Sequence, residues 1–167
     1  MRIFLVDDQA LVRAGFRMLI DAQPDMEVVG EAPDGREALE RLSVTRADVV
    51  LMDVRMPELD GVRTTELLLE RPDAPKVIVL TTFDVDEYVY AAIRAGASGF
   101  LLKDARPEEL LSAIRAVVAG DAVIAPSATR RLLENLAAAL PTPDPRLEEL
   151  TAREREVLLL VARGRSN

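Results

Sequence analysis

The sequence predicts an α/β fold, in which a doubly wound, five-stranded parallel sheet has helices on both faces. Five short apolar runs punctuate roughly the first hundred residues, and four of them are nearly continuous rather than alternating. Continuous apolar runs are typical of strands that helices cover on both sides. Helical patterns separate the runs, and the intervals are long enough for the helical crossovers that parallel strands require.

The second apolar run is the shortest and weakest, which favours an edge position in the sheet. With right-handed crossovers, the expected strand order is 2-1-3-4-5. In this order the first and third strands flank the topological switch point, where doubly wound sheets bind ligands. The predicted strands are Ile3–Val6, Val28–Val29, Val49–Met52, Val77–Leu80 and Phe100–Leu102.

The first helical pattern begins near Ala10 and carries two adjacent apolar stripes, so we expect it to bury a broad face. Later helices have clear stop signals, because proline disfavours helix in the residue before it and glycine suits a left-handed cap. The two stripes are Val12, Phe16 and Leu19, and Leu11, Gly15 and Met18. The further helices are expected at 34–42, 61–70, 86–95 and from Pro107 to the residue before Gly120.

The composition excludes several kinds of chemistry. The 167 residues include no Cys and no His, and the formal net charge is −8. Without Cys there is no disulfide, thiol nucleophile or thiolate metal site, and without His any phosphohistidine must be on another molecule. The acidic balance argues against an electrostatic nucleic-acid binder. No apolar stretch is long enough to span a membrane and Met1 leads directly into a strand-like run, so we expect a soluble, cytoplasmic protein.

Four of the five predicted strands end in a reactive polar residue. Because the carboxyl ends of neighbouring parallel strands meet at one crevice, these side chains are expected to converge. Two like charges about 4 Å apart repel by roughly 4 kcal/mol at an effective dielectric of 20, so converging carboxylates favour a bound cation or a raised pKa. Mg²⁺ prefers such oxygen ligands. The residues are Asp7 and Asp8, Asp53, Thr81 and Lys103.

Each of these residues also has an ordinary interpretation. Asp8 and Asp53 are each suited to capping, Asp8 at the helix near Ala10 and Asp53 at the turn that follows it. Thr81 alone is a common β-branched strand residue, and Lys103 alone is a common solvated strand end. Their joint placement favours the functional interpretation, because an ammonium and a hydroxyl are the donors that a carboxyl phosphate needs.

Four stretches of the sequence closely resemble bacterial response-regulator receiver domains, which have a flavodoxin-like fold. The likeness covers residues 1–120. These stretches are Val6-Asp7-Asp8, Asp53-Val-Arg-Met-Pro-Glu-Leu-Asp-Gly61, Leu80-Thr81-Thr82 and Gly99-Phe-Leu-Leu-Lys103.

The resemblance implies a role for each site residue. Asp53 would be the phosphoacceptor, which receives a phosphoryl group from a partner sensor histidine kinase. Asp7, Asp8, Asp53 and the main-chain carbonyl of Arg55 would hold Mg²⁺. Thr81 would be the switch hydroxyl, and Lys103 would pair with the acceptor carboxylate or its phosphate. Phe100 would be the switch aromatic, which moves into a space that opens when Thr81 turns inward.

The composition changes after Gly120, and we divide the chain into a receiver domain (1–120), a linker (121–147) and a C-terminal part (148–167). The linker carries a helical pattern and then repeated prolines, which suit a semi-rigid tether. In the last part, Thr151 and Glu154 have capping-box spacing. The run from Leu150 to Asn167 resembles the start of a LuxR-type helix-turn-helix domain, so the whole resembles a NarL/FixJ-family transcriptional regulator.

The sequence stops before the recognition helix that such a domain places in the major groove. We therefore expect promoter DNA to be a partner of the full-length protein but not, specifically, of this chain. Family members commonly bind two half-sites, so a homodimer is also expected to suit the function.

We interpret the chain as a phosphorylation-switched transcriptional regulator that catalyses its own phosphorylation and dephosphorylation. Two alternatives remain at this point. An aspartate-nucleophile phosphatase would release phosphate steadily from small esters, beyond one equivalent of self-labelling. A phosphate-independent interaction module would keep its partner binding in an Asp53→Asn variant, with or without a phosphodonor.

Arg55 and Phe83 flank the acceptor at positions that we expect to border the path of the hydrolytic water. Their bulk should slow dephosphorylation, so Phe83→Glu should shorten the half-life of the aspartyl phosphate. The measurement is the decay of the phosphorylated protein over time. An unchanged half-life would show that the steric explanation is wrong.

Overall fold

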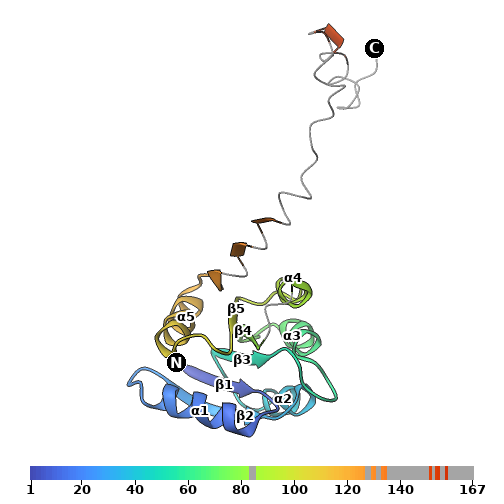
Figure 1. Cartoon of the computed structure of the whole chain (residues 1–167). Coiled ribbons are helices and arrows are strands. Elements are labelled where there is room, and N and C mark those ends of the chain that lie inside the picture. The colour runs from blue at the N-terminus through green and yellow to red at the C-terminus, as the bar shows by residue number, and fades with distance from the viewer. Residues whose placement is uncertain are drawn as a thin grey trace. The chain divides into compact units, whose positions relative to one another are not determined.

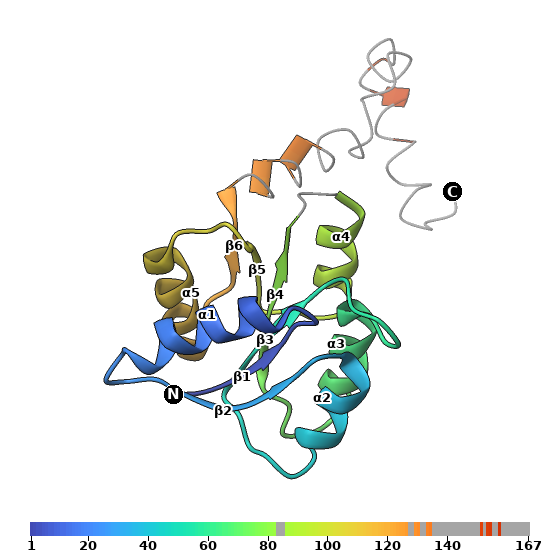
Figure 2. The same cartoon turned by 60° about the horizontal axis from the view of Figure 1, so that its bottom comes forward.

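The structure is a computed structural model that describes residues 1–82, 86–126, 129–130, 133–134, 151, 153–154 and 157. Its sheet has the order β2-β1-β3-β4-β5-β6 (Figures 1 and 2), and every strand pair is parallel. The predicted order 2-1-3-4-5 is confirmed. The strands are β1 (Arg2–Val6), β2 (Glu27–Ala32), β3 (Val49–Asp53), β4 (Lys76–Thr81), β5 (Gly99–Leu102) and β6 (Val123–Ile124).

The prediction of five strands was one too few, because β6 adds a sixth strand beside β5. Val123 and Ile124 pair with Gly99 and Phe100. Two apolar residues after a helix-ending glycine are too short a run to stand out as a strand in the sequence. β6 places residues just beyond Gly120 in the same sheet as the rest of the fold.

Five helices connect the strands and cover both faces of the sheet. Figures 1 and 2 show α1 and α5 on one face and α2, α3 and α4 on the other, which is the doubly wound arrangement expected from the sequence. The helices are α1 (Ala10–Asp21), α2 (Gly35–Arg41), α3 (Gly61–Leu69), α4 (Asp86–Arg94) and α5 (Pro107–Ala119).

The central strands form the core. Every residue of β3 is buried, as is all of β1 and β4 beyond their first residues. β2 is mostly half-buried, as its edge position requires. Burying one such Val, Leu or Ile side chain stabilises the fold by about 1.5–3 kcal/mol. The buried strands therefore fix the positions of the loops at their carboxyl ends.

The expectation of a broad buried face on α1 was wrong. Leu11 is 86% exposed and Met18 is 77% exposed, so the second stripe faces away from the sheet. The buried side of α1 is narrower and is centred on Ile20, with Phe16 half-buried. The physical reason is that one sheet face contacts only one stripe of a helix.

The helix ends follow the sequence signals. Asp34 and Asp60 are the N-caps of α2 and α3, and each side chain accepts a main-chain N–H three residues later. Gly120 ends α5 with a φ of 105°, in the left-handed region that favours glycine.

The contacts divide the chain into one unit at Met1–Arg131 and another at Leu132–Asn167. In the second unit the expected capping box is present. The Thr151 N–H donates to Glu154 Oε2 at 2.9 Å, and the Glu154 N–H donates to Thr151 Oγ1 at 3.4 Å. Residues 129–130 and 133–134 of the expected linker helix are described and are helical, whereas its other residues from 127 to 140, the proline-rich tether and Phe83 lie outside the described residues. Among the described residues, no helix has the length and apolar character needed to cross a bilayer.

Gly61 begins α3 and lies directly against the main chain of Asp53. A Cβ at position 61 would lie 1.8 Å from the Asp53 carbonyl oxygen. Gly61→Ala should therefore lower the free energy of unfolding by about 1–3 kcal/mol or more, since the backbone must move to relieve the overlap. Urea denaturation followed by circular dichroism measures the change.

Gly15→Ala is the matched control. Gly15 lies inside α1, and nothing is within 4 Å of its Cβ position. Alanine should raise the stability there by about 1 kcal/mol, because glycine is a poor helix former. Equal effects at the two positions would contradict the steric argument.

Candidate functional site

The polar strand ends converge as the parallel topology requires. Asp53 is the last residue of β3 and Thr81 the last of β4, and Asp7 and Lys103 directly follow β1 and β5. The Lys103 main-chain N–H donates to the Thr81 carbonyl at 2.8 Å, which ties the last two strand ends together. The five predicted residues therefore lie at the carboxyl ends of the neighbouring strands β1, β3, β4 and β5.

Lys103 lies between two buried carboxylates. Its Nζ is 2.6 Å from Asp7 Oδ2 and 2.8 Å from Asp53 Oδ2, and all three side chains are at most 7% exposed. A single ammonium thus faces two carboxylates in a region of low solvent access, where charge interactions are stronger than in water. The interpretation of Lys103 as a solvated strand end is wrong.

Asp8 completes the acidic group from the solvent side. Carboxylate oxygens of Asp7, Asp8 and Asp53 all lie within 4.8 Å of one another, and Asp8 is exposed. Asp8 does not cap the following helix, since the N-cap of α1 is Gln9. Two buried acids and one exposed acid make a cluster that is open to an ion from solution.

Burial and charge act in opposite directions on these groups. Burial raises the pKa of Asp53 above its ordinary value, and Asp7 adds to the rise, while Lys103 and the main-chain N–H of Arg55 lower it by less. Burial would lower the pKa of Lys103, but the carboxylates of Asp53 and Asp7 raise it above its ordinary value. Burial therefore acts against the ionised form of Asp53, and Lys103 acts in its favour.

The donor set fits a hard divalent cation. All the ligand atoms of the cluster are carboxylate oxygens, which suit Mg²⁺. Although Asp7 Oδ2 is near Lys103, it is buried and has no donor in hydrogen-bonding geometry. Its ion-pair partner Lys103 is a single ammonium shared by two buried carboxylates beside a third acid, so a divalent cation would offset the negative charge that remains.

The loop between β3 and α3 is folded tightly behind Asp53. The Gly61 N–H donates to the Val54 carbonyl at 2.9 Å, and the Leu59 N–H donates to the Pro57 carbonyl at 2.7 Å. Glu58, inside this turn, has a φ of 63°, which is strained for a residue other than glycine. Asp53 also accepts the Arg55 N–H, so its interpretation as a turn cap holds alongside its place in the cluster.

The two predicted switch residues lie in the core. Thr81 and Phe100 are each 1% exposed, and Phe100 pairs in the sheet with Val79. Phe100 therefore already occupies a buried position in this structure. The Arg55 side chain is exposed, and the use of its carbonyl as a ligand stays a prediction.

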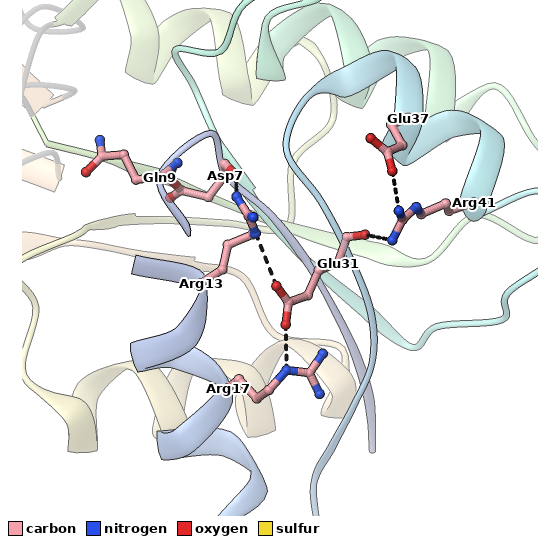
Figure 3. Close-up of polar contacts among 7 residues, drawn as sticks. All are labelled: Asp7, Gln9, Arg13, Arg17, Glu31, Glu37 and Arg41. Carbon is pink, nitrogen blue, oxygen red and sulfur yellow. Dashed lines mark hydrogen bonds and ion pairs between the residues drawn. The ribbon is translucent and has the colours of Figure 1, made fainter. Parts of the chain in front are cut away.

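The sequence analysis missed the residues that hold Asp7 from the side of α1 and β2. Asp7 Oδ1 accepts the Gln9 N–H at 2.9 Å, and Arg13 Nη1 donates to the Asp7 carbonyl at 2.5 Å. Arg13 also pairs with Glu31 of β2 (Figure 3). A signal was available, because a charged residue within an otherwise apolar strand needs a partner.

Comparison with known proteins identifies the family. A model of the response regulator receiver domain matches residues 3–115. The chain is 45% identical over 168 residues to the "Uncharacterized transcriptional regulatory protein YxjL" of Bacillus subtilis (strain 168). The matched stretch covers 99% of this chain and 77% of that protein. It is 36% identical over 165 residues to the nitrate/nitrite response regulator protein NarL of Escherichia coli (strain K12), and this match covers 99% of this chain and 76% of NarL.

Solved structures agree with this. A LuxR-family two-component response regulator from Aurantimonas sp. SI85-9A1 matches with a TM-score of 0.77 and 34% identity, over 81% of this chain and 97% of that one. The response regulator ChrA of a heme-sensing two-component system matches with a TM-score of 0.66 and 36% identity, over 99% and 76%. The resemblance seen in the sequence is thus confirmed: the chain belongs to the two-component response regulators of the NarL/LuxR family, and residues 3–115 are its receiver domain.

Proposed function

We propose that Asp53 is the phosphoacceptor and that it receives a phosphoryl group from the phosphohistidine of a sensor histidine kinase in a Mg²⁺-dependent step. The observation that carries the proposal is the Lys103 ammonium between the buried carboxylates of Asp53 and Asp7, with Asp8 completing an acidic cluster. Since this chain contains no His, the phosphohistidine belongs to the partner.

The residues have distinct roles in the transfer. A carboxylate oxygen of Asp53 attacks phosphorus, the P–N bond of the donor breaks, and the imidazole leaves with the electron pair. Lys103 offsets charge on the phosphoryl oxygens. Asp7, Asp8, Asp53 and the Arg55 carbonyl would hold Mg²⁺, which supplies further positive charge to those oxygens when bound. In the later hydrolysis, a water oxygen attacks phosphorus, the P–O bond to Asp53 breaks, and the Asp53 carboxylate leaves with the electron pair, so the chain catalyses both its own phosphorylation and its dephosphorylation.

The phosphorylated state is read by β4 and β5. The Thr81 hydroxyl would donate to a phosphoryl oxygen, and Phe100 would be held in its buried position. Because Phe100 is already buried here, phosphorylation would stabilise an arrangement that the chain already adopts. It would thereby increase the population of that arrangement.

The output of the switch is transcriptional control. We assign residues 1–120 to the receiver, 121–147 to a linker whose first residues add β6 to the receiver sheet, and 148–167 to the start of a LuxR-type helix-turn-helix. Promoter DNA would then be a partner of the full-length protein. The relatives named above as transcriptional and response regulators support this. A homodimer would match the two-fold symmetry of paired half-sites, and the setting would be cytoplasmic.

Asp53→Asn should abolish phosphorylation, because an amide cannot act as the carboxylate nucleophile. Intact-mass measurement after incubation with acetyl phosphate and Mg²⁺ should detect one added phosphate on the wild type and none on the variant. Asp48→Asn is a suitable control, because Asp48 lies at the other end of β3, and it should label like the wild type.

Equal labelling of wild type and Asp53→Asn would overturn the assignment of the acceptor. Steady release of phosphate from small esters, far beyond one equivalent, would instead indicate a phosphatase. Partner binding that ignores both the phosphodonor and Asp53 would indicate an interaction module.

Lys103→Met should destabilise the metal-free protein by about 3–5 kcal/mol, because it leaves two buried carboxylates without their cation. MgCl₂ should then raise the melting temperature of this variant more than that of the wild type, since the metal replaces the lost charge. Thermal unfolding in EDTA and in MgCl₂ measures both effects.

Lys76→Met provides the control, because Lys76 is exposed at the opposite end of β4. Its stability and its response to Mg²⁺ should match those of the wild type. An equal Mg²⁺ response in Lys103→Met and the wild type would contradict the proposed arrangement of charges.

A further inference from the structure

Arg13 connects the acid-bearing loop to the neighbouring strand. Its Nη1 donates to the main-chain carbonyl of Asp7 at 2.5 Å, and its Nε donates to Glu31 Oε2 at 3.1 Å (Figure 3). The Arg13 side chain is only 16% exposed. One guanidinium thus links the residue that follows β1 to a carboxylate of β2, using two of its donors in a fixed planar geometry.

Glu31 is itself held from several directions. Arg17 Nε donates to Glu31 Oε1 at 2.5 Å, and Arg41 of α2 donates to the Glu31 main-chain oxygen at 2.6 Å. Arg41 also pairs with Glu37. Figure 3 shows these groups as a continuous chain of contacts from α1 across β2 to α2. Glu31 is therefore an anchored partner for Arg13.

The loop that follows β1 needs such an anchor because it places the carboxylates of Asp7 and Asp8 close to that of Asp53. Carboxylate oxygens of Asp7, Asp8 and Asp53 lie within 4.8 Å of one another, and at such distances like charges repel by several kcal/mol. The Asp7 N–H donates to the Ala32 carbonyl at 3.2 Å. Together with the contacts of the Asp7 carbonyl and carboxylate, this main-chain bond restrains the loop against repulsion.

We propose that Arg13, anchored by Glu31, is a positioning residue that holds Asp7 and Asp8 in place for the divalent cation. Arg13 would act through the main chain of Asp7, because its side chain donates to the Asp7 carbonyl and to Glu31 rather than to the carboxylates of the acidic cluster. This inference rests on the proposed function of the acidic cluster. It gives α1 and β2 a role in metal affinity, in addition to the role of the acidic residues themselves.

Charge alone predicts the opposite effect. Arg13 is a cation near a cation site, so its removal would strengthen Mg²⁺ binding if only electrostatics mattered. Loss of positioning would weaken binding, because the acids would no longer be held together. The direction of the change in Mg²⁺ affinity therefore separates the two explanations.

The test compares Arg13→Met, Arg13→Lys and the control Arg17→Met. Arg17 is on the same helix and pairs with the same Glu31, but its recorded ion-pair partners are Glu31 and Asp21, away from the acidic loop. Lysine keeps the charge but is a point donor that cannot span two acceptors as a guanidinium does. The probe is MgCl₂ alone, titrated into ¹⁵N-labelled protein and followed through the amide signals of Gln9 and Arg55.

Arg13→Met should raise the Mg²⁺ dissociation constant about tenfold or more, which is the typical effect of removing a group that orients a metal ligand. Arg13→Lys should lie between this variant and the wild type, and Arg17→Met should stay within about twofold of the wild type. In acetyl phosphate labelling, Arg13→Met should need more Mg²⁺ for half-maximal rate. At saturating Mg²⁺ its rate should return to within about twofold of the wild type.

Unchanged or tighter Mg²⁺ binding by Arg13→Met would overturn the proposal, as would an equal loss of affinity in Arg17→Met. Thermal unfolding in EDTA checks that the two variants are folded to a similar degree. If Arg13→Met does not fold, Glu31→Gln serves instead, and unweakened Mg²⁺ binding by it would overturn the proposal. A wild type that binds no Mg²⁺, or labelling that survives Asp53→Asn, would show that the proposed function itself had failed.

Discussion

The structure depends on keeping two buried carboxylates beside one buried ammonium. Lys103 lies within 2.8 Å of an oxygen of both Asp7 and Asp53, and all three side chains are buried. Bringing such charges out of water costs several kcal/mol for each ion. That cost is offset by the attraction between the ammonium and the carboxylates, whose positions at the strand ends are set by the buried, close-packed strands.

The parts of the fold have different relations to this cluster. The β1 side is fastened by main-chain bonds and by arginine side chains from α1, so that Asp7 is held at its N–H, its carbonyl and its carboxylate. The β4 and β5 side instead presents Thr81 and Phe100, whose side chains are packed in the core. Under the proposed function, the acidic side would stay fixed while the side of Thr81 and Phe100 responds to phosphate through a population shift.

The sequence was enough to predict the α/β class, the order of five strands and the convergence of Asp7, Asp53 and Lys103, because each follows from apolar runs and from where the runs end. It was not enough for features set by distant contacts. Arg13 and Glu31 are 18 residues apart, and nothing in the sequence separates Arg13 from Arg17. The exposure of Leu11 depends on which stripe of α1 meets the sheet. β6 is two residues long and owes its conformation to β5.

The contact between Gly61 and the Asp53 carbonyl has a consequence for how this gene can drift. Any side chain at position 61 would press on the backbone of Asp53, the proposed phosphoacceptor. A loss of stability and a displacement of Asp53 would then have the same cause. Position 15 has room for alanine, whereas at position 61 every side chain would require the backbone of Asp53 to move.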